Sequence, residues 1–195
     1  MDNPKIEGSR RDELLQTAAR LFREKGYHAT TMKDIAAELE ILPGSLYHHI
    51  NSKQSLLVEI MTRGIQALLD YVEPVVASDE SAAVKLSKLI GFHIQAITQH
   101  PDILTVFLHE LKSLPPTERA EQLALRNRYE ELLTQIIQQG QRSGEFRHQM
   151  HPRMTTFAIL GMLNWLYAWY RADGSLSPEE IADEYVALVL KGVTA

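Results

Sequence analysis

Three polar side chains on one short segment, Ser45, Tyr47 and His48, have the chemistry needed to bind a nucleic acid. Serine and histidine can contact base edges, and a tyrosine hydroxyl can satisfy a phosphate oxygen. Leu46 and Ile50 lie four residues apart, so on a helix they would share a face turned away from the polar side chains and toward a core. A solvated polar face is the alternative for any single polar residue.

Two short helices must position these side chains. Pro43 suits the first turn of the helix that carries them, because a missing N–H costs nothing there. Before it, a capping pair of Thr31 and Asp34 begins a helix. That helix has apolar residues at i, i+3, i+4 and i+7, namely Met32, Ile35, Ala36 and Leu39. Two such helices with a tight break form a helix-turn-helix, whose second helix offers its N-terminal side chains to the major groove.

Residues 10–57 resemble the DNA-binding domain of the tetracycline-repressor (TetR) family of bacterial regulators. The resemblance rests on three fragments in this order and spacing: AARLFREKGYHATTMKDIA, PGSLYHHI and SKQSLL. Glu40 stands where the family commonly has a turn glycine, so we expect a left-handed backbone there at some cost. Leu42 stands where a small capping residue is common, so we expect the second helix to lack a side-chain N-cap.

The resemblance also implies which residues contact DNA. In the family, these are side chains at the start of the first helix of the motif, along the second, and a phosphate-contacting lysine at the start of the next helix. The matching positions here are Thr31, Met32, Lys33, Pro43, Gly44, Ser45, Tyr47, His48 and Lys53. The implied function is a transcriptional regulator, by the family's prevailing habit a repressor, that binds a palindromic double-stranded operator as a homodimer.

Composition limits the alternatives. The 195 residues are 45% hydrophobic and contain no cysteine, which argues against a disordered chain, a disulfide framework and a thiolate metal site. With no membrane-spanning apolar run and no signal-peptide pattern, we expect a cytoplasmic protein. Residues 1–55 hold eight basic and eight acidic side chains, so the net charge of −5 arises beyond them. The cations available for phosphates, Arg10, Arg11, Lys33 and Lys53, predict DNA binding with a modest salt dependence.

The sequence gives no sign of catalytic or metal chemistry. Although the chain has eight histidines, none forms a His-x₃-His pair with a supporting carboxylate, and the adjacent His48 and His49 would point about 100° apart on a helix. A nucleophile elbow and a phosphate-binding glycine loop are also missing. We therefore expect no cofactor, no metal site and no enzyme; an enzyme is kept only as a remote alternative.

Helical periodicity continues through the rest of the chain. We predict an all-α fold of about nine helices in two domains. A helix-turn-helix DNA-binding domain takes residues 1–52, and an effector-binding and dimerisation domain takes residues 53–195. Its helices are expected over residues 53–76, 81–99, 103–111, 117–142 and 154–172, and from residue 178 onward.

The segment from residue 154 to 172 is the most apolar and aromatic of the chain. An aromatic stripe on a helix serves packing more often than ligand binding. Asn164 and Arg171, however, need polar partners, which a carboxyl, thioester or phosphate-bearing effector would supply. We predict an effector site that includes Phe107, His109, Arg128, Asn164, Trp165, Trp169 and Arg171.

The segment MLNWLYAWYRADGSLSPEEIADEYVALVL also resembles the C-terminal part of a TetR subgroup that responds to acyl-coenzyme A (acyl-CoA) thioesters. This resemblance implies release from DNA by an acyl-CoA, with Arg128 and Arg171 among the candidates for its phosphates. Surface ion pairs explain these arginines equally well. The alternative is a regulator that senses an aromatic or drug-like compound in the control of efflux or stress.

The last two expected helices would expose too much apolar surface in a monomer, so we assign the dimer interface to them. The predicted interface residues are Leu160, Leu163, Tyr167, Ile181, Tyr185, Leu188 and Val189. Effector binding is expected to favour a spacing of the two reading helices that no longer fits the operator, with the helix over residues 53–76 as the lever.

Overall fold

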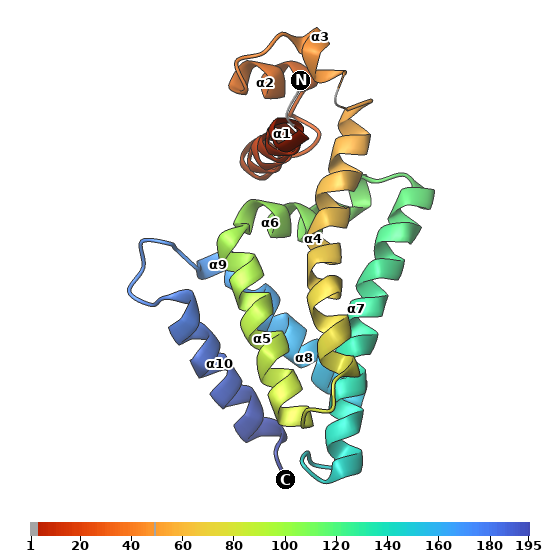
Figure 1. Cartoon of the computed structure of the whole chain (residues 1–195), viewed down its shortest axis with the longest axis vertical. Helices are drawn as coiled ribbons and strands as arrows, with labels where there is room; N and C mark the ends of the chain where they lie inside the picture. Colours follow the sequence, from red (N-terminus) through yellow and green to blue (C-terminus); the bar gives the residue numbers. More distant parts are fainter. Residues whose placement is uncertain (1–3, 49) are drawn as a thin grey trace. The chain divides into compact units, whose positions relative to one another are not determined.

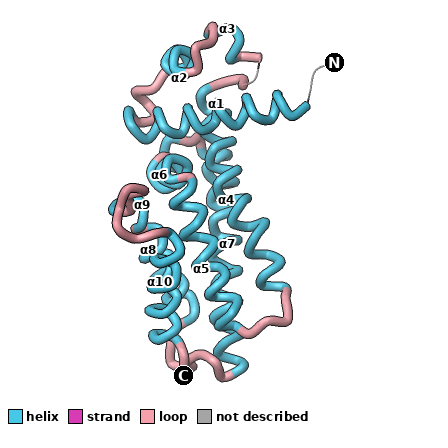
Figure 2. Tube along the Cα trace, turned by 60° about the vertical axis from the view of Figure 1, so that its left-hand side comes forward, coloured by secondary structure: helices cyan, strands magenta, loops and turns pink. Residues whose placement is uncertain are grey.

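The computed structural model describes residues 4–48 and 50–195 (Figure 1). Within these ranges the chain forms ten α-helices and one short 3-10 helix, and Figure 2 shows helices joined by loops without a strand. The all-α prediction is confirmed. None of the helices over the described residues has the length and apolar character needed to cross a bilayer. His49, considered above beside His48, lies outside the described residues.

Packing divides the chain into two compact units. The first comprises Met1–Gly64 and Asp102–Leu123, and the second comprises Ile65–Pro101 and Ala124–Ala195. Helix α4 (Lys53–Ala77) contributes residues to both units. The boundary expected after residue 52 concerns function, which these packing units do not test, so it stays a prediction.

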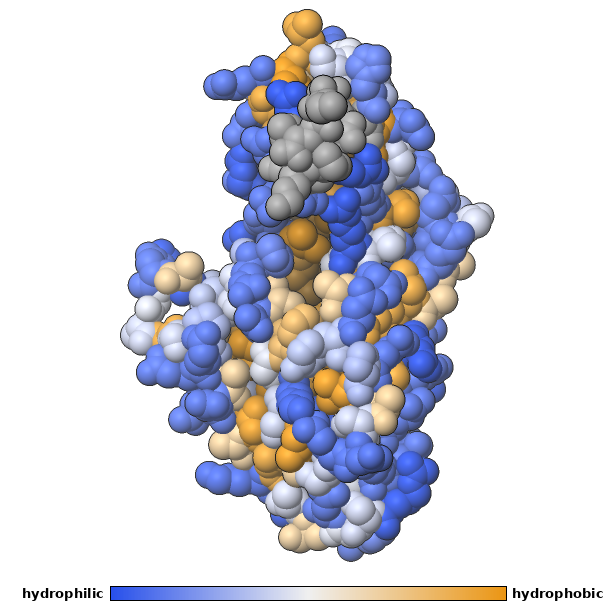
Figure 3. Space-filling view, in the orientation of Figure 1, coloured by the Kyte–Doolittle hydropathy of each residue, from blue (hydrophilic) through white to orange (hydrophobic). Residues whose placement is uncertain are grey.

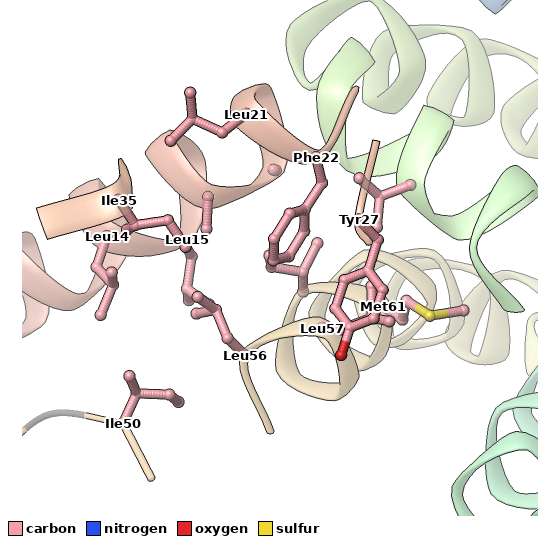
Figure 4. Packing of buried hydrophobic residues seen from close by; sticks show 14 of the residues in the cluster. Leu14, Leu15, Leu21, Phe22, Tyr27, Ile35, Ile50, Leu56, Leu57 and Met61 are labelled. Carbon is pink, nitrogen blue, oxygen red and sulfur yellow. The ribbon is translucent and has the colours of Figure 1, made fainter. Parts of the chain in front are cut away.

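The first unit has a hydrophobic core formed chiefly by helices α1 and α4. Figure 4 shows Leu15 and Phe22 of α1 in the same cluster as Leu56, Leu57 and Met61 of α4. Gly26 ends α1 with a φ of 85°, a left-handed conformation that favours glycine. The elements in this unit are α1 (Pro4–Lys25), α2 (Met32–Glu38), α3 (Pro43–Leu46), α6 (Pro101–His109, from Asp102 on), the 3-10 helix η1 (Leu111–Ser113) and the starts of α4 and of α7 (Pro116–Ser143).

The helix-turn-helix formed by α2 and α3 confirms three local predictions. Helix α2 begins with a capping box, in which the Thr31 hydroxyl accepts from the Asp34 N–H at 3.1 Å and the Asp34 carboxylate accepts from the Thr31 N–H at 2.7 Å. Glu40 has a φ of 54°, in the left-handed region. Leu42 occupies the N-cap of α3 without a side-chain hydrogen bond, which forgoes about 1 kcal/mol of the stability that a polar cap provides. The motif therefore contains two positions that are not optimised for stability.

Replacing Glu40 with glycine is expected to raise the free energy of unfolding by about 0.5–1 kcal/mol, because glycine adopts the left-handed conformation without the Cβ penalty. The Glu40→Ala variant retains a Cβ and serves as the control, with no comparable gain. Urea denaturation of the three proteins measures the difference. A glycine variant no more stable than the parent protein would contradict the strain at this turn.

In the second unit, helix α5 packs against α8, α9 and α10. The helix expected over residues 154–172 is interrupted at Trp165, whose N–H still bonds to the Gly161 carbonyl, so that α8 and α9 are separate. Helix α10 begins with a capping box of Ser177 and Glu180, with Pro178 in its first turn. The elements that complete this unit are α5 (Ala82–Gln99), α8 (Pro152–Asn164), α9 (Leu166–Trp169), α10 (Pro178–Val193) and the remaining parts of α4 and α7.

The segment after α7 connects three parts of the second unit. The Glu145 carboxylate accepts hydrogen bonds from the N–H groups of Ala82 and Ala83, at 3.2 and 3.1 Å, at the start of α5. The adjacent Phe146 is fully buried and forms an isolated bridge with Thr194 near the C-terminus. Its ring lies against Gly140 so closely that a Cβ there would come within 2.1 Å of it. The segment thus anchors both the start of α5 and the C-terminal end of α10.

Glu145 gives the second unit an expected acid dependence. Burial raises the pKa of this carboxyl, but hydrogen bonds from the Ala83 N–H, the Ser143 hydroxyl and the Ala82 N–H outweigh it, so the pKa lies below its ordinary value. A lowered folded-state pKa adds stability above the unfolded-state pKa of about 4.3, and this stability is lost as the pH falls through the folded-state pKa.

We expect Glu145→Gln to lower the free energy of unfolding by about 1 kcal/mol at pH 7, because an amide is a weaker acceptor than a carboxylate. The difference between parent and variant should shrink toward zero at the acid end of the folded range. Urea denaturation at pH 7 and at a series of lower pH values provides the measurement. An undiminished difference in acid would show that the carboxylate charge is not what stabilises this contact.

Candidate nucleic-acid interface and effector site

The surface predicted to contact DNA lies on and around α3. Leu46 and Ile50 are buried, with 1% and 6% of their surface exposed, and they anchor the segment to the core of the first unit. The intervening Tyr47 is 53% exposed. Exposure is shared by all the predicted contact residues of this segment, which are Pro43, Gly44, Ser45, Tyr47 and His48. The core-facing and outward-facing sides of α3 are thus the ones that the sequence predicted.

The predicted contacts at the start of α2 differ in what they can offer to DNA. The Thr31 hydroxyl is already engaged, since it donates to the Asp34 carboxylate at 2.6 Å and accepts from the Asp34 N–H. Met32 is partly buried against the core of the first unit. Lys33 is exposed and forms no ion pair within the described residues. Lys33 is therefore the side chain of the three that can reach a phosphate unhindered.

Lys53 has contacts within its own chain that the sequence did not predict. Its ammonium group donates to the carbonyls of Tyr27 and Thr30, both at 2.8 Å, and to that of His28 at 3.4 Å. It also lies 4.3 Å from the centre of the Tyr27 ring. An ammonium has three donors, and all three are used here. Lys53 holds the loop between α1 and α2 in place, and its expected contact with a phosphate stays a prediction.

Few cations of the first unit are available to phosphates. Arg11 donates to both carboxylate oxygens of Glu59, at 2.8 and 2.6 Å, and Arg23 pairs with Asp102 at 2.7 Å. Arg20 pairs with Glu24 and Glu38. Of the four cations predicted to serve DNA, only Arg10 and Lys33 form no ion pair or carbonyl contact among the described residues. The modest salt dependence of DNA binding stays a prediction, and fewer cations than expected are available to produce it.

The predicted effector residues fall in both units. In the first, Phe107 packs against the hydrophobic core and His109 is exposed. In the second, Asn164 has a partner from its own chain: its Oδ1 lies 3.3 Å from Nε2 of His93. On the other side of the His93 ring, Nδ1 lies 2.9 Å from the Tyr129 hydroxyl. The partner that we expected an effector to supply for this amide oxygen is thus already present.

His93 and Tyr129, the polar partners of this network, were not among the site residues predicted from the sequence. Burial lowers the pKa of His93 to about 4, so the ring is neutral at physiological pH, and burial also raises the pKa of Tyr129. A neutral ring with Nε2 protonated donates to Asn164 and accepts from Tyr129. The available signal was the position of His93 on a buried stripe of α5 that is otherwise mostly apolar, with Leu86, Leu89, Ile90, Ile94 and Ile97.

The other predicted effector residues of the second unit lie at its surface. Trp165 is 61% exposed and Trp169 is 42% exposed. Two arginines form ion pairs within the chain, Arg128 with Glu73 at 3.1 Å and Arg171 with Asp173 at 3.2 Å. A cavity of about 370 Å³ in this unit has a polar lining and includes none of the predicted residues; it is lined by Asn127, Glu130, Glu131, Thr134, Gln135, Gln138 and Arg153.

The predicted dimer residues are mostly turned inward. Leu160, Leu163, Ile181 and Val189 are at most 8% exposed in the second unit, and Tyr167 and Tyr185 are partly buried. Leu188 alone of the seven is largely exposed. A different stripe of α8 faces outward, with the periodicity of a single helix face: Met154, Phe157, Ala158, Gly161 and Trp165. The exposed apolar surface of α8 therefore lies on the side opposite the predicted residues.

Comparison with known proteins matches two segments of the chain to family models. The family model described as "Bacterial regulatory proteins, tetR family" matches residues 14–60, and "Tetracyclin repressor-like, C-terminal domain" matches residues 79–193. The HTH-type transcriptional repressor KstR2 of Rhodococcus jostii is 33% identical, over 100% of this chain and 96% of its own length.

Two solved structures are similar along nearly the whole chain. The ketosteroid transcriptional regulator KstR2 of Mycobacterium tuberculosis has a TM-score of 0.89 at 29% identity, covering 95% of each chain. AibR, solved in complex with isovaleryl coenzyme A and operator DNA, has a TM-score of 0.81 at 32% identity, covering 92% of this chain and 97% of its own.

Proposed function

The chain belongs to the TetR family of DNA-binding transcriptional regulators, and we propose that it acts as a homodimeric repressor released from its operator by a small apolar effector. The observation that carries the proposal is the exposed polar face of α3, held by the buried Leu46 within the segment that matches the family's DNA-binding part. KstR2 of Rhodococcus jostii, which is similar over nearly its whole length, is described as a transcriptional repressor. No feature of the described residues favours an enzyme instead.

The proposed operator contacts come from the first unit. Ser45, Tyr47 and His48 meet base edges and phosphates, and the exposed Gly44 allows the backbone to approach. Lys33 and Arg10 supply charge to phosphates. In a two-fold symmetric dimer, these surfaces read two half-sites about one helical turn apart.

The proposed dimer interface uses the outward stripe of α8 together with Leu188 of α10. Phe157 and Trp165 are 40% and 61% exposed, which is a large apolar area for one helix face to leave in water. Between them, Ala158 and Gly161 leave room for the backbone of a partner helix to come close. A second copy would cover this surface isologously, as two-fold symmetry requires.

We propose an acyl-CoA thioester as the effector. Support comes from AibR, which was solved with isovaleryl coenzyme A and operator DNA and is similar along nearly the whole chain. Of the predicted effector residues we retain Asn164, whose amide nitrogen has no protein partner among the described residues, and the exposed Trp169 and Arg171 that follow it. A ring-bearing apolar compound is the second candidate, because the similar KstR2 is described as a ketosteroid regulator.

A gel shift with the DNA upstream of the protein's own gene tests both parts of the proposal. The protein is expected to retard this DNA, and one acyl-CoA from a panel that includes isovaleryl-CoA is expected to release it. Release by steroid-like or aromatic compounds alone would move the effector to the second candidate. No retardation of any specific fragment would overturn the regulator proposal.

Two variants test the arginine that we retain. Arg171→Ala should require about tenfold more acyl-CoA for release if this side chain binds a CoA phosphate, since one charged hydrogen bond is worth about that factor. Arg142→Ala, at an exposed arginine in the last turn of α7, is the matched control and should respond like the parent protein.

A further inference from the structure

Leu42 is a large hydrophobic side chain that is exposed to solvent. It lies in the turn between α2 and α3, and 77% of its surface is exposed, the largest value among the exposed large hydrophobic residues of the described part. Its neighbours Leu39 and Ile41 pack against the core of the first unit, so the turn is anchored without it. Figure 3 shows hydrophobic surface at the end of the first unit where α3 lies.

The backbone at Leu42 would accept a polar residue. Its φ of −68° and ψ of 139° are those of an ordinary N-cap, and a serine in this conformation can accept a hydrogen bond from the first turn of the next helix. Leucine offers no such bond, and no side-chain cap forms. The free protein would therefore be more stable with a polar residue at position 42. The stability of the free protein thus does not explain the leucine, and a contact with a partner molecule does.

The neighbouring residues identify the chemistry of that partner. Leu42 directly precedes Pro43, Gly44 and Ser45, which are exposed and belong to the surface proposed to read DNA. The apolar group that base edges present in the major groove is the C5-methyl of thymine. We infer that Leu42 contacts a thymine methyl group in each half-site and thereby determines part of the operator sequence. This inference rests on the proposed function, because it requires that α3 enters the major groove.

The test removes the contact between Leu42 and the methyl group in two ways, once by changing the DNA and once by changing the protein. In the operator fragment that the protein retards, each thymine is replaced by uracil at symmetric positions of both half-sites, which deletes only the methyl group. The parent protein is expected to bind about 5- to 10-fold more weakly at one such position. Leu42→Ser is expected to bind the thymine and uracil versions of that position within twofold of each other.

Two controls separate this inference from other causes. Leu42→Ser is expected to unfold at the same or a higher urea concentration than the parent protein, which excludes misfolding. Leu176→Ser, at an exposed leucine between α9 and α10, should keep the full sensitivity to uracil. If the parent protein binds its operator but tolerates every uracil, or if Leu42→Ser keeps the parent's sensitivity, the inference is wrong. If the parent protein binds no operator, the proposed function fails and this inference fails with it.

Discussion

Replacing Tyr47 with alanine is expected to weaken operator binding by about 30- to 1000-fold while leaving the protein as stable as its parent. The side chain follows α3 directly and is 53% exposed, so its loss opens no cavity. A hydroxyl bonded to a phosphate oxygen, with the ring packed along the backbone, is worth about 1–2 kcal/mol in each subunit. A dimer loses this twice, which gives the stated range. A fluorescence-anisotropy titration with labelled operator measures the affinity.

Tyr47→Phe divides this effect into its parts, because it keeps the ring and removes only the hydroxyl. We expect an intermediate loss if the hydroxyl bonds to phosphate. Urea denaturation of the parent protein and both variants checks that the fold is intact. If the alanine variant bound the operator as tightly as the parent protein, α3 would not be the reading element, whatever its resemblance to one.

Replacing Gly161 with glutamate is expected to convert the dimer to a monomer and to reduce operator affinity by at least 100-fold. Gly161 lies in the middle of the outward stripe of α8, and a Cβ there meets no atom of its own chain within 4 Å. The glutamate therefore fits the isolated subunit, in which it is also a better helix former than glycine. In the proposed dimer it would place charge and bulk in the apolar interface, and a monomer loses the avidity of two half-sites.

Gly161→Ala is the matched control, because it raises helix propensity with one methyl group and without charge. Sedimentation of the parent protein and both variants at equal concentration gives the oligomeric state, and urea denaturation shows whether the subunit folds. A glutamate variant that sediments as a dimer and binds the operator normally would place the interface elsewhere on the second unit.

Local features of the chain could be predicted from the sequence because their signals are local. The capping box of Thr31 and Asp34 and the left-handed backbone at Glu40 each depend on residues within a few positions. The outward face of α3 followed in the same way, from the spacing of two buried apolar residues. These elements position the residues of the proposed nucleic-acid interface, whose contacts with DNA stay a prediction.

Features that depend on distant residues could not be predicted. Helix α8 is apolar on more than one side, so its sequence alone does not show which side faces its own core and which a partner. For this reason the predicted dimer residues included Leu163, which the second unit buries completely. The partner of Asn164 is His93, 71 positions away in the chain. Likewise, the carbonyls that bind Lys53 are brought to it by the packing of the loop after α1.

The left-handed backbone at Glu40 has a consequence for the gene. Every glutamate codon becomes a glycine codon through a single transition at its second base, so a more stable turn is always one point mutation away. Random mutagenesis followed by selection for heat resistance should therefore recover Glu40→Gly early and repeatedly. If such variants regulate normally, the glutamate persists because nothing has selected against it. If they regulate poorly, the strained turn is part of what the regulator needs.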